Sequence, residues 1–360
     1  MMKNKHTLYI ILGLLLSLII SVLYYDKSKK SSISYNNENN IVVVEISPKK
    51  VKSYFNIFDM NLNLKKKIVA NNGIIGTHRQ SFSINKNRLY MTVDYISSFA
   101  GQKPYDKLLV FSLDNFKKSH ITLGDYSPDS LLVDNKNIYT TFNWSEGVTL
   151  YKQNKNGNIV KKVNIDPHHK GLVSRIVDLN DKIVLIYENI LDRKSSFWVV
   201  SKDSLNILEK IPIKINSFPS YFDAVYKDGL LCSVGTNQDG ENESILTVFD
   251  VKTKKVSNFN YNKGEFASIF DIGNKLIIFS CDNKRDENSK STIFEFDKSK
   301  KILSAQKRID GPIEKVIKVD GFYYAIGYNN IYKISKDYIV DKKISISKNY
   351  NSEIFNINKK

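Results

Sequence analysis

The chain has 360 residues, 42% of them hydrophobic, and its 54 Lys and Arg against 37 Asp and Glu give a net charge of +17. This much apolar material can form a large core, which excludes a disordered chain. Only six of the basic residues are arginine, and the lysines are spread along the whole sequence. Nucleic-acid binding needs basic and stacking groups gathered on one face, so we expect no nucleic-acid partner; an anionic cell-wall polymer suits a diffuse positive charge better.

The N-terminus carries an uncharged run, TLYIILGLLLSLIISVLYY, at residues 7–25. Nineteen helical residues span about 28 Å, close to the hydrocarbon thickness of a bilayer. Tyr24 and Tyr25 stand at its end, where aromatic rings favour the membrane interface. We therefore expect an uncleaved membrane anchor, with a cleaved signal peptide as the alternative.

The anchor divides the chain into four parts. The predicted boundaries are a cytoplasmic tail at 1–6, the transmembrane anchor at 7–25, a polar linker at 26–40 and a folded domain at 41–360. Lysines flank the anchor on both sides in nearly equal number, so the orientation rests on the usual insertion of an N-terminal first helix. This orientation predicts a single-pass protein of the cell membrane, with the folded domain outside the cytoplasm.

Pairs of short apolar strands recur along the rest of the chain. Each pair is joined by a tight turn of Asn, Asp, Lys or Gly, residues that accept the geometry of a short hairpin. The six pairs are SFSINKNRLYMTV (81–93), SLLVDNKNIYTTF (130–142), RIVDLNDKIVLIY (175–187), FDAVYKDGLLCSV (222–234), SIFDIGNKLIIFS (268–280) and KVIKVDGFYYAIG (315–327). Their second strands begin 45 to 49 residues apart, at Leu89, Ile138, Ile183, Leu230, Leu276 and Phe322.

A further second strand, IVVVEIS, begins at Ile41 without a first strand before it. The missing partner stands at the C-terminus as EIFNINKK, residues 353–360. Each unit also continues into a third and a fourth strand, and four strands at a period near 47 are typical of a β-propeller blade. We therefore predict an all-β, seven-bladed β-propeller in which the C-terminal segment is the innermost strand of the first blade, beside 41–70, with Phe355 buried.

Two of the third-to-fourth hairpins carry a family resemblance. At LTVFDVKTKKV (246–256) and TIFEFDKSKKI (292–302) the chain resembles the YVTN-like and quinoprotein-like propellers of bacteria, in architecture and without a specific family. It departs from them in having Lys254 and Lys300 where a turn glycine is common. It also lacks their periodic tryptophans and vicinal cysteines, so we expect no quinone cofactor, and no other cofactor is indicated.

Propeller topology gathers the second-to-third loops and the blade-to-blade connections at one end of the molecule, and here these segments are long. Exposed aromatic side chains beside basic ones suit recognition of sugars or peptides. The candidate ligand-binding residues are Phe99, Tyr105, Trp144, Arg193, Phe218, Tyr221 and Arg285. The alternative is that several of them anchor loops against the blade edges.

Sequence signatures of catalysis and metal binding are absent. The chain has no G-x-S-x-G, H-E-x-x-H, P-loop or G-x-G-x-x-G motif, and adjacent His168 and His169 do not usually chelate one ion together. We therefore predict no metal site and a non-catalytic binding or scaffolding module of the cell envelope, which binds an envelope protein, a peptide or an anionic cell-wall polymer. The alternative is an envelope hydrolase or lyase acting on carbohydrate or peptide at the loop-rich end of the propeller.

Overall fold

The structure is a computed structural model, and it describes most of the chain beyond the predicted linker. The described residues are 39–75, 80–95, 106–123, 128–144, 147–168, 171–215, 217–239, 243–262, 264–283, 286, 288–346 and 350–357. The predicted anchor at 7–25 lies outside this part. No helix among the described residues is long and apolar enough to cross a membrane.

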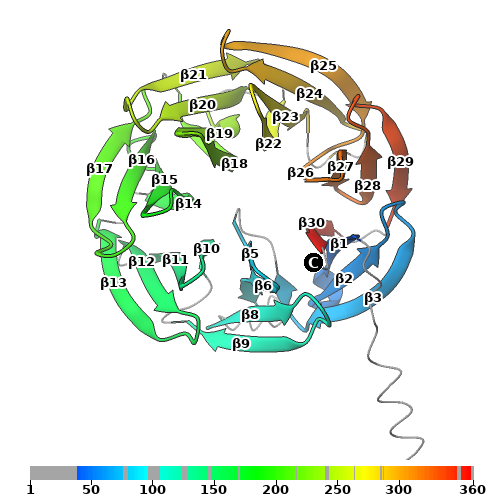
Figure 1. The fold of residues 1–360 in the computed structure, drawn as a ribbon, viewed down its shortest axis with the longest axis horizontal. Helices are drawn as coiled ribbons and strands as arrows, with labels where there is room; N and C mark the ends of the chain where they lie inside the picture. The colour runs from blue at the N-terminus through cyan, green and yellow to red at the C-terminus, as the bar shows by residue number, and fades with distance from the viewer. Residues whose placement is uncertain are drawn as a thin grey trace, which may run out of the picture.

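Seven four-stranded antiparallel sheets stand around a common axis as the blades of a propeller (Figure 1). Blade 1 consists of β30 (Tyr350–Ile357), β1 (Asn40–Ser47), β2 (Lys52–Phe58) and β3 (Leu64–Asn71), from the inside outwards. Blade 2 consists of β5 (Phe82–Asn85), β6 (Arg88–Met91), β8 (Lys107–Ser112) and β9 (Lys118–Thr122). Blade 3 consists of β10 (Ser130–Val133), β11 (Asn137–Trp144), β12 (Gly147–Asn154) and β13 (Ile159–Asp166).

The remaining blades repeat this order. Blade 4 consists of β14 (Gly171–Asp178), β15 (Lys182–Asn189), β16 (Lys194–Ser201) and β17 (Ile207–Pro212), and blade 5 of β18 (Pro219–Lys227), β19 (Leu230–Asn237), β20 (Ser244–Asp250) and β21 (Val256–Tyr261). Blade 6 consists of β22 (Glu265–Ile272), β23 (Lys275–Cys281), β24 (Lys290–Asp297) and β25 (Ile302–Asp310), and blade 7 of β26 (Lys315–Val319), β27 (Phe322–Gly327), β28 (Asn330–Ile334) and β29 (Val340–Ser345). A 3-10 turn, η1 (Pro48–Lys50), joins β1 to β2, and β4 (Ile74–Ile75) pairs with β7 (Val93–Tyr95) beside blade 2.

The ring closes through β30, as the count of strands predicts. β30 pairs antiparallel with β1, with Phe355 opposite Val42 and Ile354 opposite Val43. The first and last described segments therefore share one sheet, and the first blade has no unpaired strand left over from the chain ends. An open edge at this point would invite association with other chains.

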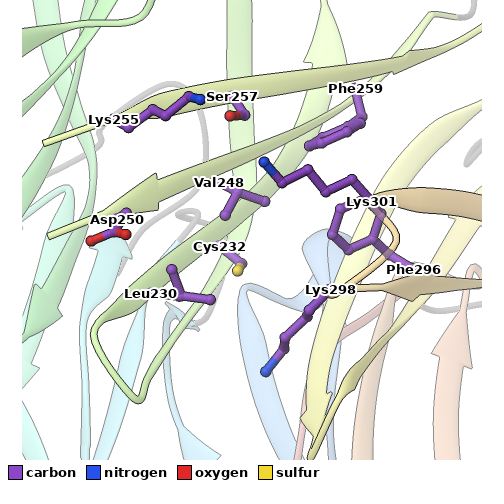
Figure 2. A pocket seen from close by; sticks show the side chains of 10 residues that line it. All are labelled: Leu230, Cys232, Val248, Asp250, Lys255, Ser257, Phe259, Phe296, Lys298 and Lys301. Atoms are coloured by element: carbon purple, nitrogen blue, oxygen red, sulfur yellow. The ribbon is translucent and has the colours of Figure 1, made fainter. Parts of the chain in front are cut away.

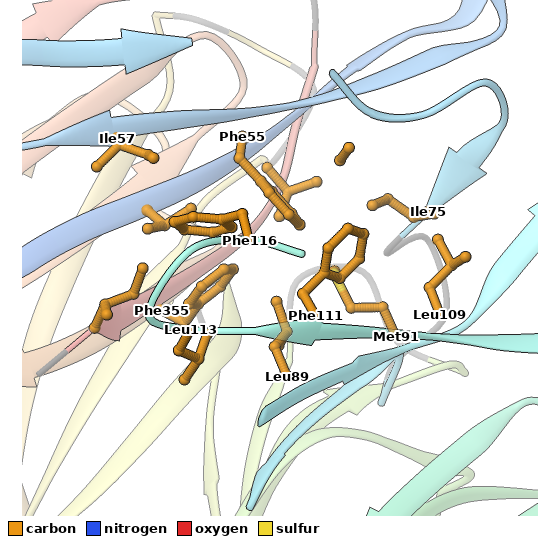
Figure 3. Close-up of a cluster of buried hydrophobic side chains, with 14 of the residues drawn as sticks. Phe55, Ile57, Ile75, Leu89, Met91, Leu109, Phe111, Leu113, Phe116 and Phe355 are labelled. Carbon is orange, nitrogen blue, oxygen red and sulfur yellow. The ribbon is translucent and has the colours of Figure 1, made fainter. Parts of the chain in front are cut away.

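β30 also fills the spaces on both sides of its blade. Phe355 and Ile357 belong to the apolar cluster between blades 1 and 2, where the Phe355 ring lies 5.9 Å from that of Phe55 in an edge-to-face arrangement (Figure 3). Ile354, which precedes Phe355, points the other way, because side chains alternate along a strand, and joins the cluster between blades 7 and 1. All three side chains are at most 6% exposed. The C-terminal strand thus connects three blades.

The two lysines that stand where similar propellers commonly have a turn glycine differ in backbone conformation. Lys254 has a φ of 61°, a left-handed conformation in which glycine is common. In the equivalent hairpin of blade 6, however, the left-handed residue is Lys301, with a φ of 57°, and not Lys300. The turn of blade 6 begins with Asp297, whose carbonyl oxygen accepts a hydrogen bond from the Lys301 amide, and this fixes the position of the left-handed residue.

We expect removal of residues 350–360 to lower the melting temperature strongly, because it strips blade 1 of its innermost strand and opens two apolar clusters. The milder substitution Phe355→Ala should cost about 3–5 kcal/mol in the free energy of unfolding, measured by urea denaturation. The matched control is Val69→Ala on the outer strand β3, where the side chain is 57% exposed and truncation should change stability by less than about 0.5 kcal/mol. Equal effects of the two alanine substitutions would contradict ring closure.

Candidate functional site

The loop-rich face is the end of the propeller that carries the connections from second to third strands and from blade to blade. In blade 4 the second-to-third connection is a short turn between Asn189 and Lys194, held by a 2.9 Å hydrogen bond from the Asp192 amide to the Asn189 side-chain oxygen. The beginning of β18 and the end of β19 lie at the same end of blade 5. These segments position the best-described candidate residues.

Arg193 and Phe218, two of the candidate residues, come together here. The Arg193 guanidinium lies over the Phe218 ring at 5.7 Å and forms an ion pair with Asp239. The other carboxylate oxygen of Asp239 accepts a 2.7 Å hydrogen bond from the Phe218 amide. Asp239 therefore ties the loop of blade 4 to that of blade 5, and the Arg193 side chain, 58% exposed, is held in a defined place at the surface.

Next to Arg193, the turn of blade 4 exposes two large apolar side chains. Ile190 is 52% exposed and Leu191 is 69% exposed. Exposed apolar residues are ordinary on protein surfaces when they are scattered. Here two consecutive ones stand at the tip of a hydrogen-bonded turn, beside an arginine fixed by an ion pair. We call Ile190, Leu191, Arg193, Phe218 and Asp239 the loop cluster.

The other predicted site residues are not part of this cluster. Tyr221 lies within β18 and is fully buried, so the expectation of an exposed aromatic side chain is wrong for this residue. Its hydroxyl is 2.7 Å from Thr247 Oγ1, and burial raises the pKa of its phenol. Phe218 is only 8% exposed and serves as the platform under Arg193. Trp144 ends β11, opposite Gly147. Phe99, Tyr105 and Arg285 lie outside the described residues, and ligand binding by any of the seven stays a prediction.

The sequence analysis missed a second polar site, the central channel. In each innermost strand, or directly before it, one polar residue is followed by an apolar one, as in Arg-Ile, Asp-Ala and Glu-Ile. The channel ring consists of Glu353, Ser81, Ser130, Arg175, Asp223, Ser268 and Lys315, one from each blade in order. Five of these seven line or border a cavity of about 170 Å³ at the axis, together with Gln80 and Phe82. A polar residue that recurs before an apolar one at the period of the repeat is the signal that could have revealed the ring.

Backbone irregularities aim these side chains at the axis. In β14, β18 and β22 the strand register shifts by one residue immediately before Arg175, Asp223 and Ser268. Such bulges bend a strand and redirect the next side chain. The bulge also leaves the Phe222 carbonyl available, and it accepts a 2.8 Å hydrogen bond from Arg175 Nε.

The charged members of the channel ring are paired with one another. Arg175 lies 3.0 Å from Asp223, whose second oxygen accepts a hydrogen bond from the Ile269 amide. Glu353 accepts hydrogen bonds from Lys315 and, at 2.6 Å, from the Ser81 hydroxyl. Burial raises the pKa of the Glu353 carboxyl, while the Lys315 ammonium opposes this shift. The channel is therefore polar, but its two carboxylates already have partners.

Neither cysteine has the character of a nucleophile. Both are buried and unbridged, and burial raises the pKa of Cys232 to about 12 and raises that of Cys281 as well. A thiol is reactive as the thiolate, so both are inert at neutral pH. Within the described part of the chain, no group of three His, Cys, Asp or Glu side chains is arranged to hold a metal ion.

Comparison with known proteins identifies the fold alone. No protein-family model and no curated protein matches the sequence. Among solved structures, a candidate 6-phosphogluconolactonase from Bacteroides fragilis superposes with a TM-score of 0.61 at 11% identity, over 89% of this chain and 98% of that one. A Lactobacillus plantarum protein gives 0.60 at 11% identity over 87% and 98%, and Kuenenia stuttgartiensis hydrazine synthase 0.59 at 14% over 81% and 94%. These likenesses confirm the seven-bladed propeller architecture expected from the sequence resemblance.

The raised pKa of Glu353 predicts a specific pH dependence. Its folded form holds a proton that the unfolded form has already released, so its contribution to stability is complete below the unfolded pKa, about 4.3, and is lost as the pH rises through the folded value. We expect Glu353→Gln to gain stability relative to the native chain between about pH 4 and about pH 7, in urea unfolding.

The matched control has the opposite sign. A hydrogen bond from Lys275 lowers the pKa of Glu295, so Glu295 stabilises the fold above its unfolded pKa. Glu295→Gln should lose stability relative to the native chain over the same interval. Parallel behaviour of the two variants would contradict this account of the channel.

Proposed function

We propose that the protein is a single-pass, membrane-anchored propeller outside the cytoplasm, and that it acts as a non-catalytic binding module for an envelope protein or peptide. The uncharged run at residues 7–25 supports the anchor and its placement. The propeller supplies a rigid scaffold on which loops from different blades stand side by side.

The observation that carries the binding role is the loop cluster. Protein-binding energy concentrates in a few residues, with arginine prominent among them, and residues that need little ordering on binding are the more effective. Arg193 is already fixed by Asp239 and by the Phe218 ring, so it loses little conformational freedom on binding. Ile190 and Leu191 offer apolar surface directly beside it. A partner with an acidic group next to an apolar one would complement this surface.

The state of the channel supports a role without catalysis. A hydrolase of carbohydrate or peptide needs carboxylates free to exchange protons with the substrate or to attack it. In the channel, Asp223 is held by Arg175 and a backbone amide, and Glu353 by Lys315 and Ser81. These contacts suit a structural role of the ring in joining the innermost strands.

The test is site-specific photocrosslinking in cells that produce the full chain. A photoreactive residue at Leu191 should give a discrete crosslinked species in the membrane fraction, and Arg193→Ala should reduce its yield about fivefold or more, as expected for a residue worth at least 1 kcal/mol. The control position is Leu208 on the outer strand β17 of the same blade, which is 54% exposed but lies towards the opposite end of the blade from the loops, next to Ile207, which pairs with Val200.

Crosslinking of equal yield from positions 191 and 208, or a species that is insensitive to Arg193→Ala, would contradict the proposal. The alternative function, a hydrolase or lyase acting on carbohydrate or peptide, can be tested in the same cells. Turnover of cell-wall glycan or peptide that is abolished by Glu353→Gln while crosslinking stays unchanged would place the activity in the channel.

A further inference from the structure

A recurring turn residue controls how the spaces between blades are filled. In every blade, the hairpin between the third and fourth strands contains one residue in the left-handed conformation. In chain order these residues are Leu62, Phe116, Gly157, Leu205, Lys254, Lys301 and Tyr338. They lie at the end of the propeller opposite the loop-rich face. We call this place the turn position.

In four blades the turn position inserts an apolar or aromatic side chain against the preceding blade. Leu62, Phe116 and Leu205 are at most 9% exposed and belong to the clusters between blades 7 and 1, 1 and 2, and 3 and 4. Tyr338 packs against the cluster between blades 6 and 7 and donates a 2.7 Å hydrogen bond to Glu295. The side chain at this position therefore completes the inter-blade core.

In two other blades the turn position is occupied by a different kind of residue. At blade 3 the turn position is Gly157, and a Cβ atom there would stand 2.7 Å from the Ile121 side chain of blade 2, so the space is already filled. At blade 5 the residue is Lys254, whose ammonium lies 2.6 Å from Glu209 on the outer strand of blade 4. Neither junction leaves a cation without a partner at this position.

Blade 6 is the exception, because Lys301 replaces the apolar side chain and has no acidic partner in the described part of the chain. The space beneath it is a pocket of about 180 Å³ between blades 5 and 6 (Figure 2). Its walls are Leu230, Cys232, Val248, Phe259 and Phe296, and the two phenylalanine rings meet edge to face at 4.7 Å. A cavity of about 150 Å³ lined by aliphatic and aromatic groups holds a benzene ring.

The rim of this pocket is positive. Lys255 and Lys301 stand at the opening, and among the described residues neither ammonium has an acidic group within ion-pair distance. Lys298, the third lysine of the rim, is instead bound to Asp271. The one carboxylate of the rim, Asp250, is engaged by the amides of its own turn, at 2.9 Å from each of two nitrogens, which lower its pKa. In Figure 2 the Lys301 side chain extends over the apolar walls, and Asp250 lies on the far side.

We propose that this pocket binds a small aromatic monocarboxylate. Its ring takes the place of the apolar turn residue that blade 6 lacks and stacks against Phe259 and Phe296. Its carboxylate reaches the Lys301 ammonium at the opening, with Lys255 as a second cation. The site lies at the opposite end of the propeller from the loop cluster, so it does not depend on the proposed binding role of that face.

Phenylacetate is the probe, and the methyl NMR resonances of Leu230 and Val248 in the full-length protein are the local readout. We expect saturable shifts of these two resonances, and weaker ones with 2-phenylethanol, the neutral counterpart. Lys301→Gln should weaken phenylacetate binding about tenfold, because a hydrogen bond to a charged group is lost.

Lys301→Leu restores the residue type found at Leu62 and Leu205. It should abolish phenylacetate binding and raise the melting temperature, because its side chain fills the pocket. The control Lys254→Leu, at the same turn position in blade 5, should leave binding unchanged. The proposal fails if the Leu230 and Val248 resonances do not respond to phenylacetate, if Lys301→Leu binds it as the native chain does, or if 2-phenylethanol binds as tightly.

Discussion

The pairing of β30 with β1 is the contact on which the rest of the structure depends. It joins segments more than 300 residues apart in sequence by backbone hydrogen bonds and by the alternating side chains of Ile354 and Phe355. Without it the chain would be a row of seven sheets with an incomplete blade at one end and a free strand at the other. With it, every blade has two neighbours, and the channel, the loop-rich face and the inter-blade spaces acquire fixed positions.

Once the ring is closed, single residues at repeated positions decide what each part of the surface can do. The polar residues of the channel ring face the axis, where a charged one must find a partner from a neighbouring blade, as Arg175 does with Asp223. The left-handed turn residue closes an inter-blade space in most blades, and a lysine at this point in blade 6 leaves a pocket. Because the blades repeat the same positions, a residue at one of these positions can be compared with its counterparts in the other blades. A residue that differs from its counterparts then indicates a local difference in function.

The sequence was a good guide to the fold, because strand periodicity and turn chemistry are local. Six strand pairs, an unpaired second strand at Ile41 and a spare first strand at the C-terminus were enough to predict seven blades and the identity of the innermost strand of blade 1. The position of the turn glycine was assigned to Lys300 in the blade 6 hairpin, whereas the left-handed residue is Lys301, because a run of adjacent lysines offers no signal for which of them has the positive φ.

The site was harder to predict, because it depends on contacts between blades. Arg193 and Phe218 were predicted because both stand in connections at one end of the molecule. Tyr221 was predicted to lie in a loop. β18 begins two residues before it, at Pro219, so Tyr221 belongs to the strand and its side chain is buried in the core. The channel ring was missed because bulges, which no local pattern indicated, turn Arg175 and Asp223 towards the axis.

Hydrogen exchange of the β30 amides that pair with β1 tests ring closure most directly, since it reports the opening free energy of that strand in the intact protein. If the C-terminal strand is an integral part of the closed ring, these amides should open with the same free energy as those of β15 in blade 4. Exchange at nearly unprotected rates in β30, while β15 remains fully protected, would contradict the account.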